Sequence, residues 1–326
     1  MRNIRLEGTF TLMSPLQHTG ESIGTDSYLS EVPIITPAGD VESVFCYSGN
    51  AWRGQLRDAA ARYMLDRLSI GPIPLPAFHL LFSGGSIGGQ QTVDIDQARR
   101  FRRWLPIISL WGGGVGNQLL PGKWCVGDSW PICEETAHLV PERFREGRLQ
   151  PYTALTYEQS FSRHDDSKDE RLRDVHLAPD EEQPQLLIDA PKAKGKKDKS
   201  DGPATQMRYT IEMMIPGARL YTRLDLKDVT DLELGCLVSA LDMFARAPYI
   251  GGGSNRGHGL VQLTYVWQDR ESGESGHFLS VGGDQVLLSE PAQEAKDAYD
   301  EFLRQAYAAH LDSHESEIKG VLEAVK

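Results

Sequence analysis

Apolar and polar positions alternate along several short stretches of the chain. Residues 4–12 place their large apolar side chains on one face of an extended backbone and their polar side chains on the other. This period of two predicts a half-buried β-strand. Residues 260–267 show the same alternation, and residues 218–226 follow a Pro216–Gly217 turn, so we expect strands at both positions.

Two other stretches have the spacing of amphipathic helices. Residues 51–68 form the first, and Asn50 stands where an N-cap residue is expected. The inner side of this helix is predicted to carry Leu56, Ala60, Tyr63, Met64 and the aliphatic stem of Arg67. The second helix opens at the capping-box sequence from Thr230 to Glu233 and ends before Pro248.

Strand, helix and strand thus occur near both ends of residues 1–270. This order is typical of the split βαβ arrangement of a ferredoxin-like or RRM-like sheet. We therefore predict one α+β domain over residues 1–270, with large insertions. Residues 14–50 are expected to be irregular, and residues 71–150, rich in Gly, Pro and Trp, to be an irregular insertion of loops and small elements.

Residues 164–206 mark the clearest change in composition. They combine few large apolar residues with dense charge of both signs, so they cannot bury enough surface to offset the entropy of ordering. The flanking segments TALTYEQSF and MRYTIEMMI are rich in β-branched and aromatic residues and predict strands. We therefore expect a long β-hairpin over residues 156–216 with a disordered, charged tip.

The chain of 326 residues carries a formal net charge of −12, but this charge is unevenly distributed. Residues 271–326 hold 12 acidic and 4 basic side chains, and we expect them to form an acidic helical tail. Its helix, over residues 289–323, is predicted to break near Ser313. Residues 50–110 hold eight Arg against four Asp. Because a polyanion responds to local charge, the acidic balance argues against nucleic-acid binding without excluding it.

Composition also bears on the compartment. The hydrophobic content of 40% and the charged content of 25% are ordinary for a soluble globular protein. No apolar stretch reaches the roughly 18 residues of a membrane span, and MRNIRLEGTF does not read as a signal peptide, so we expect a cytoplasmic protein with no membrane partner. The cysteines include no CxxC pair, so we expect them reduced and buried, with no metal and no cofactor. They are Cys46, Cys125, Cys133 and Cys236.

The segment SGNAWRGQLR, residues 48–57, is the first candidate site. A loop rich in Gly and Ser ends there at a helix start, where free backbone N–H groups favour an anion. Arg53 and Arg57 lie four residues apart on one helical face, and their guanidinium groups suit phosphate. The alternative is a solvated basic face that pairs with Asp58 and Asp66.

The glycine-rich segment YIGGGSNRGHG, residues 249–259, is the second candidate site. Its glycines allow close approach of the backbone to a ligand, and Asn255, Arg256 and His258 supply donors. It follows a helix and precedes a strand, the reverse of a Rossmann fingerprint, and it lacks the GK[ST] of a P-loop. The alternative is a tight helix-to-strand connection.

Taken in order, these segments resemble the RAMP superfamily of CRISPR-associated proteins, specifically its crRNA-binding backbone subunits. The resemblance runs over most of residues 4–267. It rests on SPLQHTG after the first strand, the SGNAWRGQLR helix start, the paired segments YEQSFSR and MRYTIEMMIPGARL, and the loop GGGSNRGHGLV. The chain length and the Trp-Gly-Gly-Gly stretch at 111–114 are most similar to the type IV backbone subunit, with the type III subunit as second choice.

The resemblance implies that many copies form a helical homo-oligomer along one crRNA, together with other CRISPR effector subunits, and that the guide pairs with a target nucleic acid. Each copy would hold RNA phosphates against its RRM-like core without regard to sequence. The hairpin over residues 156–216 would be a thumb that kinks the guide, with the thumb residues Arg163, Arg208, Met213 and Met214. The implied RNA-binding residues are His18, Ser48, Asn50, Arg53, Arg57, Gly252, Gly253, Ser254, Asn255, Arg256 and His258.

Catalysis is where the sequence departs from the family pattern. In type III relatives an Asp after a glycine in the early loop cuts target RNA with a divalent metal, and Asp26 stands at a similar place here. The residues after Asp26 do not follow the pattern well, and the segment from His18 to Asp26 has no metal-ligand spacing, so we expect no enzymatic activity. The alternatives are an endoribonuclease that uses Asp26 and a small-molecule enzyme whose glycine-rich loops hold a nucleotide phosphate.

Overall fold

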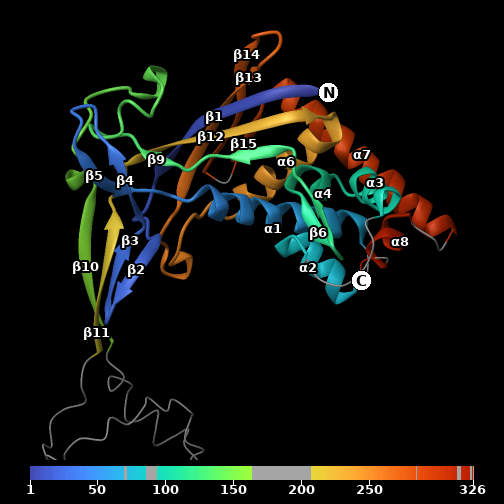
Figure 1. The fold of residues 1–326 in the computed structure, drawn as a ribbon, viewed down its shortest axis with the longest axis horizontal. Helices are drawn as coiled ribbons and strands as arrows, with labels where there is room; N and C mark the ends of the chain where they lie inside the picture. Colours follow the sequence, from blue (N-terminus) through green and yellow to red (C-terminus); the bar gives the residue numbers. More distant parts are fainter. Residues whose placement is uncertain are drawn as a thin grey trace, which may run out of the picture.

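A seven-stranded β-sheet forms the centre of the molecule (Figure 1). The computed structural model describes residues 1–69, 72–85, 94–163, 207–283, 285–313, 317–323 and 325. The strands of this sheet are β1 Arg2–Leu12, β8 Trp124–Val126, β9 Trp130–Pro131, β12 Arg219–Val229, β13 Val261–Asp269, β14 Ser275–Gly282 and β15 Gln285–Leu288. Within the described residues they run in the order β15-β14-β13-β1-β12-β8, and β9 also pairs with β12.

Two helices connect these strands as split βαβ units. Helix α1 (Gly49–Leu68) follows β1, and helix α6 (Asp231–Ala245) joins β12 to β13. Both hydrogen bonds of the predicted capping box, between Thr230 and Glu233, are present at the start of α6. β1 lies between β12 and β13 and is antiparallel to both, and β8 is antiparallel to β12. This is the ferredoxin-like order, so the predicted α+β fold class is confirmed.

The alternation in β1 decides which face of the sheet meets the helices. The apolar side chains of β1 are buried in the main core, together with side chains of α1 and α6. They are Ile4, Leu6, Phe10 and Leu12. Helix α7 (Glu290–Ser313) packs against α6 and α1, so the helices cover one side of the sheet (Figure 1). The polar side chains of β1 and β12 therefore point to the opposite side, the outer face.

Helix α1 begins earlier than predicted, and its N-cap is Ser48 rather than Asn50. The Ser48 hydroxyl accepts a hydrogen bond of 3.2 Å from the Asn50 N–H. The prediction failed because Ser and Asn both suit an N-cap, and the pattern does not show which residue leaves the helical backbone. Four predicted inner residues are buried, whereas the Arg67 side chain is 54% exposed and pairs with Asp300. The buried ones are Leu56, Ala60, Tyr63 and Met64.

A four-stranded sheet projects from the body as an arm (Figure 1). Its strands are β2 Thr19–Ile23, β3 Asp26–Leu29, β10 Thr156–Arg163 and β11 Met207–Met214, in the order β10-β11-β3-β2. β10 and β11 pair antiparallel over their whole length, as the predicted hairpin requires. The predicted tip, residues 164–206, lies outside the described residues.

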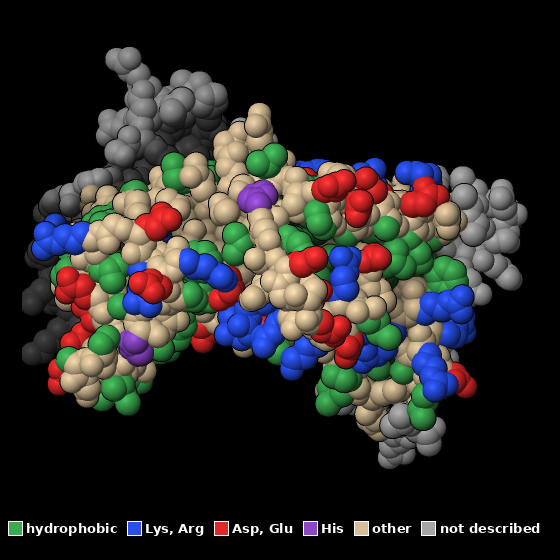
Figure 2. Space-filling model, turned by 90° about the horizontal axis from the view of Figure 1, so that it is seen from above, with side chains coloured by type: hydrophobic (Ala, Val, Ile, Leu, Met, Phe, Trp, Pro, Cys, Tyr) green, Lys and Arg blue, Asp and Glu red, His purple; other side chains and the backbone are tan. Residues whose placement is uncertain are grey.

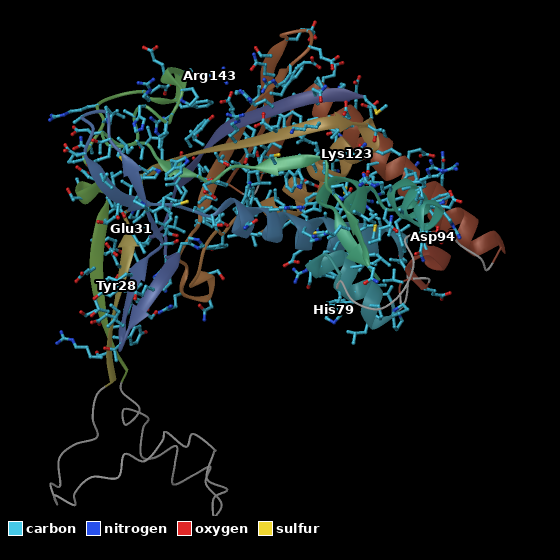
Figure 3. The ribbon with its side chains drawn as sticks, in the orientation of Figure 1. Tyr28, Glu31, His79, Asp94, Lys123 and Arg143 are labelled. Atoms are coloured by element: carbon cyan, nitrogen blue, oxygen red, sulfur yellow. The ribbon has the colours of Figure 1, made fainter. Side chains whose placement is uncertain are left out.

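Residues 14–50, which were predicted to be irregular, contain two hairpins. These are β2–β3 and β4–β5, with β4 at Glu31–Ile35 and β5 at Val41–Phe45. Their strands are short and mostly exposed, so they show little hydrophobic alternation. Tyr28 and Glu31 lie on this part of the chain (Figure 3). Glu31 accepts a hydrogen bond of 2.6 Å from the Tyr152 hydroxyl, which ties β4 to the segment before β10.

The described part of residues 71–150 is more regular than predicted. It contains the helices α2 Leu75–Ser83, α3 Ile95–Trp104 and α4 Pro106–Trp111, the short strands β6 Gly113–Val115 and β7 Gln118–Leu120, and the 3-10 turn Glu142–Phe144, besides β8 and β9. A second 3-10 turn, Tyr152–Ala154, follows just after this segment. Leu81, Phe101 and Leu110 belong to the main core. These elements were missed because closely spaced Gly and Pro hide short helices from a periodicity argument.

The prediction of an acidic helical tail over residues 271–326 is wrong for its first part. β14 and β15 extend the main sheet from β13. Helix α7 then ends at Ser313, where the break was predicted, and α8 (Glu317–Glu323) follows. One side of α7 is buried against the other helices through Ala292, Ala295, Tyr299 and Leu303. This segment is therefore a layer of the fold, not a free tail.

Three of the four cysteines are buried as predicted, but Cys125 is exposed on β8. Burial raises the pKa of the Cys133 thiol to about 11 and that of the Cys46 and Cys236 thiols to about 12. The prediction that Cys125 is buried was wrong, because β8 is only three residues long and shows no alternation that would indicate which side chains face outward. Among the described residues, no helix combines the length and the apolar character needed to cross a bilayer.

Candidate nucleic-acid interface

The start of α1 was predicted to offer free N–H groups to an anion. In the structure the Gly49 N–H donates to the Asp128 carboxylate at 2.8 Å, and the Asn50 N–H donates to Ser48. An added Cβ at Gly49 would lie 2.5 Å from the Val126 carbonyl oxygen, so only glycine fits beside the segment after β8. Because the protein's own groups already satisfy these two N–H groups, the helix end alone makes a weak anion site.

Arg53 and Arg57 lie on one side of α1, as their spacing predicts, but they differ in burial. Arg57 is 9% exposed, and its guanidinium donates to the carbonyl oxygens of Leu81, at 2.9 Å, and Gly112. Arg53 is half-buried and donates to the carbonyl oxygen of Trp111. Burial, and secondly the charge of Arg53, lower the pKa of Arg57 to about 10. Arg57 therefore stays charged at neutral pH while it ties the end of α2 and the end of α4 to α1.

Both arginines line a cavity of about 560 Å³ beside α1. Several glycines line the same cavity, together with apolar side chains. They include Gly84 and Gly85 after α2, Gly112 after α4, and Gly113 and Gly114 of β6. An added Cβ at Gly85 would lie 2.1 Å from the Gly114 carbonyl oxygen, so these segments pack backbone against backbone. The cavity therefore presents peptide groups and two guanidinium groups, a combination suited to an anionic ligand.

Gly54 lies in the interior of α1, next to Arg53, and lines the same cavity. Apart from its chain neighbours and the backbone of its own helix, an added Cβ at Gly54 would have no described atom within 4 Å. A glycine inside a helix costs about 1 kcal/mol relative to alanine. Nothing in the described fold requires this glycine, so it is consistent with a ligand that approaches the helix closely.

The glycine-rich loop 249–259 lies against the segment that leads from β1 into the arm. Gly251 has φ +71°, and an added Cβ there would lie 2.3 Å from the Gln17 carbonyl oxygen. The Gly252 N–H donates to the same oxygen at 2.7 Å. The tight-connection interpretation of this loop therefore holds for Gly251. It does not account for Ser254, Asn255 and Arg256, which are exposed.

Arg256 connects this loop to the arm. Its guanidinium lies 3.5 Å from the Tyr209 hydroxyl and 3.3 Å from the Gln17 Oε1. The guanidinium carbon lies 5.8 Å from the centre of the Phe161 ring, and the Phe161 and Tyr209 rings stack at 5.3 Å. An exposed arginine thus lies beside two stacked aromatic rings where the arm meets the loop.

Gln17, Phe161 and Tyr209 were missed as site residues in the sequence. A signal for the aromatic pair is present, because Phe161 and Tyr209 are directly opposite each other in the β10–β11 register, and a cross-strand aromatic pair is a recognisable feature of a hairpin. Finding it requires the length of the hairpin loop, which the sequence pattern did not fix.

The two predicted histidines are more enclosed than expected. His258 is 8% exposed, and its Nδ1 has no hydrogen-bond partner among the described residues. Burial, and secondly the charge of Arg256, lower its pKa. His18 makes edge contacts with the rings of Phe45 and Tyr47, and burial lowers its pKa too. Both rings are therefore neutral at pH 7, which leaves Arg256 as the cationic group of this loop.

Helix α1 and the glycine-rich loop lie next to each other. The Gln55 amide donates to the Tyr249 carbonyl oxygen, and the Tyr47 hydroxyl donates to Gln55 at 3.3 Å. Tyr47 in turn contacts the His18 ring, with 5.0 Å between ring centres. The structure thus brings together the three segments that the sequence singled out, around residues 17–18, the start of α1 and the loop 249–259.

The predicted thumb residues have different positions. Arg208 is exposed on β11, and Arg163 is the last residue of β10, paired with Met207. Met213 and Met214 are fully buried, and Met214 belongs to the main core. As free thumb side chains for RNA these two methionines are a wrong prediction, because the root of β11 is packed into the body.

Asp26 begins β3 on the arm, where it is paired with Thr210 of β11 and Ile23 of β2. Across the part of the chain that the structure describes, no group of three or more His, Cys, Asp or Glu side chains is placed to hold a metal ion. Asp26 therefore lies on a strand rather than in a loop. The absence of enzymatic activity stays a prediction, and catalysis through Asp26 stays its alternative.

No protein-family model matches the chain, and no curated protein matches it. A solved structure described as "Type IV-B CRISPR Complex" contains a chain with a similar fold. The TM-score is 0.56 at 20% sequence identity, and the match covers 80% of this chain and 90% of that chain. The chain therefore shares its α+β fold with a component of a type IV CRISPR complex, in agreement with the resemblance found in its sequence.

Proposed function

We propose that this chain is a subunit of a CRISPR effector ribonucleoprotein that binds crRNA through its phosphate backbone. The fold shared with a component of a type IV-B CRISPR complex supports this proposal. The observation that carries it is the position of Arg256, exposed beside the stacked rings of Phe161 and Tyr209. A cation next to aromatic rings is the usual surface for single-stranded RNA.

The cavity beside α1 supports the same function. Arg53 and the glycines around it can accept a phosphodiester group, and Gly54 leaves room for a close approach. Arg57 acts by positioning, because its guanidinium is committed to the carbonyl oxygens of Leu81 and Gly112. The contacts fall on phosphate rather than on base edges, so the binding is independent of guide sequence.

The arm corresponds to a thumb in this proposal. Copies of the chain line up along the guide as a helical homo-oligomer, with other CRISPR effector subunits at its ends, and each arm kinks the RNA. The surface that each copy presents to RNA is small. Affinity therefore grows with the number of copies on one strand.

The test is binding of single-stranded RNA by the wild-type chain, Arg53→Ala, Arg256→Ala and the double variant, over a range of salt concentrations. Because Arg57 is buried, it is left unchanged, so that loss of binding is not confused with loss of folding. The slope of log K against log salt is negative, and each lost phosphate contact reduces its magnitude by about 0.7. The matched control is Arg62→Ala, which removes an exposed charge elsewhere on α1.

RNA that co-purifies with the chain and is released by RNase is expected for the wild type and is reduced for the double variant. Unchanged affinity and unchanged salt slope in a folded double variant would contradict the proposal. The proposed role is non-catalytic. Magnesium-dependent cutting of complementary RNA at regular spacing, lost in Asp26→Ala, would replace it with an endoribonuclease.

A further inference from the structure

The outer face of the main sheet carries a cationic cavity of about 520 Å³ that the proposed RNA-binding surface does not include. Four basic residues and two acidic residues line it, in a chain with a net charge of −12. The basic ones are Arg5, Arg223, Lys227 and Arg270. Figure 2 looks onto this side of the molecule and shows Lys and Arg side chains interspersed with Asp and Glu.

The sheet register builds this cavity. Arg5 of β1 is paired with Asp225 of β12, and Asp225 is paired with Cys125 of β8. Directly paired residues project to the same face, so these three side chains form a row across three strands. Arg223 lies two residues from Asp225 and therefore projects to the same face.

Asp225 orients three guanidinium groups. The Arg5 Nε donates to its Oδ1 at 2.8 Å, the Arg223 Nε donates to its Oδ2 at 2.7 Å, and an Arg270 nitrogen lies 3.6 Å from Oδ1. Burial alone would raise the pKa of Asp225, but the hydrogen bonds from Arg5 and Arg223 outweigh it and lower the pKa. One carboxylate therefore fixes three cations and leaves an excess of positive charge in the cavity.

We propose that this cavity is a phosphate-binding site on the outer face of the sheet. Arg5 of β1, Arg223 of β12 and Arg270 of the turn after β13 converge on one point. Guanidinium groups that converge from different segments suit a tetrahedral phosphate, whose oxygens point in several directions. A planar carboxylate accepts guanidinium groups within one plane, and Asp225 already supplies that partner. The phosphate belongs either to a nucleic-acid strand or to a free nucleotide or phosphate ion.

Cys125 gives a direct measure of occupancy because it lines the cavity. Of the four cysteines, all within described parts of the chain, it is the exposed one, and the other three are buried. A thiol reagent applied to the folded, nucleic-acid-free chain therefore labels Cys125 first. A ligand at about three times its Kd is expected to slow this labelling about fourfold.

The experiment measures the labelling rate with inorganic phosphate, a mononucleotide, a single-stranded oligonucleotide or an oligo-glutamate peptide, at matched ionic strength. Protection is expected in the wild type and in the control Arg304→Ala, and its loss is expected in the double variant Arg223→Ala, Arg270→Ala. If the oligonucleotide protects Cys125 at a far lower concentration of phosphate groups than inorganic phosphate or the mononucleotide does, the ligand is a nucleic-acid strand. Equal protection by all phosphate probes identifies a free phosphate compound.

Two results would overturn the site. These are the absence of protection by every phosphate probe, and protection that persists in the folded Arg223→Ala, Arg270→Ala variant. Stronger protection by oligo-glutamate than by any phosphate probe would contradict phosphate as the ligand and indicate an acidic peptide instead. The variant Arg53→Ala, Arg256→Ala keeps this protection if the outer-face site is separate, so failure of the proposed RNA surface and failure of this cavity are distinguishable.

Discussion

Arg53 and Arg57 are identical side chains one helical turn apart, but they differ in burial and in their hydrogen-bond partners. Arg57 is buried, and it donates to the carbonyl oxygens of Leu81, in the last turn of α2, and of Gly112, directly after α4. Arg53 is half-buried and also lines the cavity. The spacing of the pair predicted one face correctly, but the burial of Arg57 depends on segments that come some 25 to 55 residues later.

Replacement of Arg57 by alanine is expected to destabilise the protein by about 2–4 kcal/mol, because it leaves buried carbonyl oxygens without donors. Arg57→Lys is expected to restore little, since one ammonium group cannot reach both carbonyl oxygens as the guanidinium does. Denaturant unfolding measures the loss. The exposed Arg62→Ala on the same helix is the control, with an expected change within about 0.5 kcal/mol. Equal stability of the Arg57→Ala and Arg62→Ala variants would contradict this role.

Glu233 gives the fold a pH dependence. Burial alone would raise its pKa, but hydrogen bonds from Lys123, Ser109 and the Thr230 N–H lower it below its ordinary value. Lys123 reaches it from the segment before β8 (Figure 3). Because the pKa of the folded state is depressed, the stabilisation is present above the ordinary pKa of about 4.3 and is lost as pH falls through the folded value.

The free energy of unfolding is therefore expected to fall as the pH is lowered from about 5 to about 3. Glu233→Gln is expected to be less stable than the wild type at pH 7 by about 1–3 kcal/mol, and the difference is expected to shrink on acidification. Denaturant unfolding at several pH values measures both quantities. A difference that stays constant with pH would show that the carboxylate charge at Glu233 does not contribute.

At the scale of elements, the packing of α7 on α6 depends on one glycine. An added Cβ at Gly235 of α6 would lie 2.1 Å from the Ala295 carbonyl oxygen and 2.7 Å from the Tyr299 Cβ. The two helices therefore approach closely at this point. In α1, by contrast, an added Cβ at Gly54 would meet no described atom within 4 Å apart from its chain neighbours and the backbone of its own helix.

Replacement of these two glycines by alanine is expected to change the free energy of unfolding in opposite directions. Gly235→Ala is expected to destabilise the protein by about 1–3 kcal/mol, because the backbone of α7 must move. Gly54→Ala is expected to stabilise it by up to about 1 kcal/mol from helix propensity, and to weaken RNA binding if a phosphate lies close to this helix. Thermal unfolding and RNA titration of both variants are the measurements. Stabilisation by Gly235→Ala would contradict the close approach of α6 and α7.

The predictability of each element followed the strength of its pattern. β1, α1, α6 and β13 were predictable because their inner faces lie in the main core and their periodicity is strong. The hairpins in residues 14–50 and the strands β14 and β15 were not, since they are short or partly exposed. In the candidate site, the glycine-rich loop made Arg256 a candidate from the sequence. The stacked pair of Phe161 and Tyr209 could not be predicted, because it depends on the register of β10 and β11, which the sequence pattern does not reveal.

At the scale of the whole molecule, local clusters of arginine occur in a chain whose net charge is negative. The chain is acidic overall, but both the cavity beside α1 and the cavity on the outer face are lined by arginines. In the proposed RNA-binding role, the global acidity would disfavour indiscriminate binding of polyanions, and the local cations would supply the contacts. The net charge of −12 is therefore compatible with an RNA-binding subunit.

A homo-oligomer along RNA is expected to grow with the length of the strand. With single-stranded RNAs of increasing length, the mass of the complex should rise in steps of one protein chain, 36.2 kDa, plus a fixed length of RNA. Mass measurement of single particles gives the step directly. The double variant Arg53→Ala, Arg256→Ala is the control, and it should need longer RNA or lower salt to form the same complex. One copy per RNA at every length would contradict assembly along the guide.

The central position of β1 in the sheet has a consequence for how the chain is made. β1 is synthesised before the other strands of the main sheet, yet its neighbours in that sheet are residues 219–229 and 261–269. Until both neighbouring strands have been synthesised, β1 has no partner to pair with in the main sheet. Folding of this sheet is therefore delayed until residues 261–269 have emerged. Nascent chains halted before residue 261 should remain sensitive to protease and dependent on chaperones.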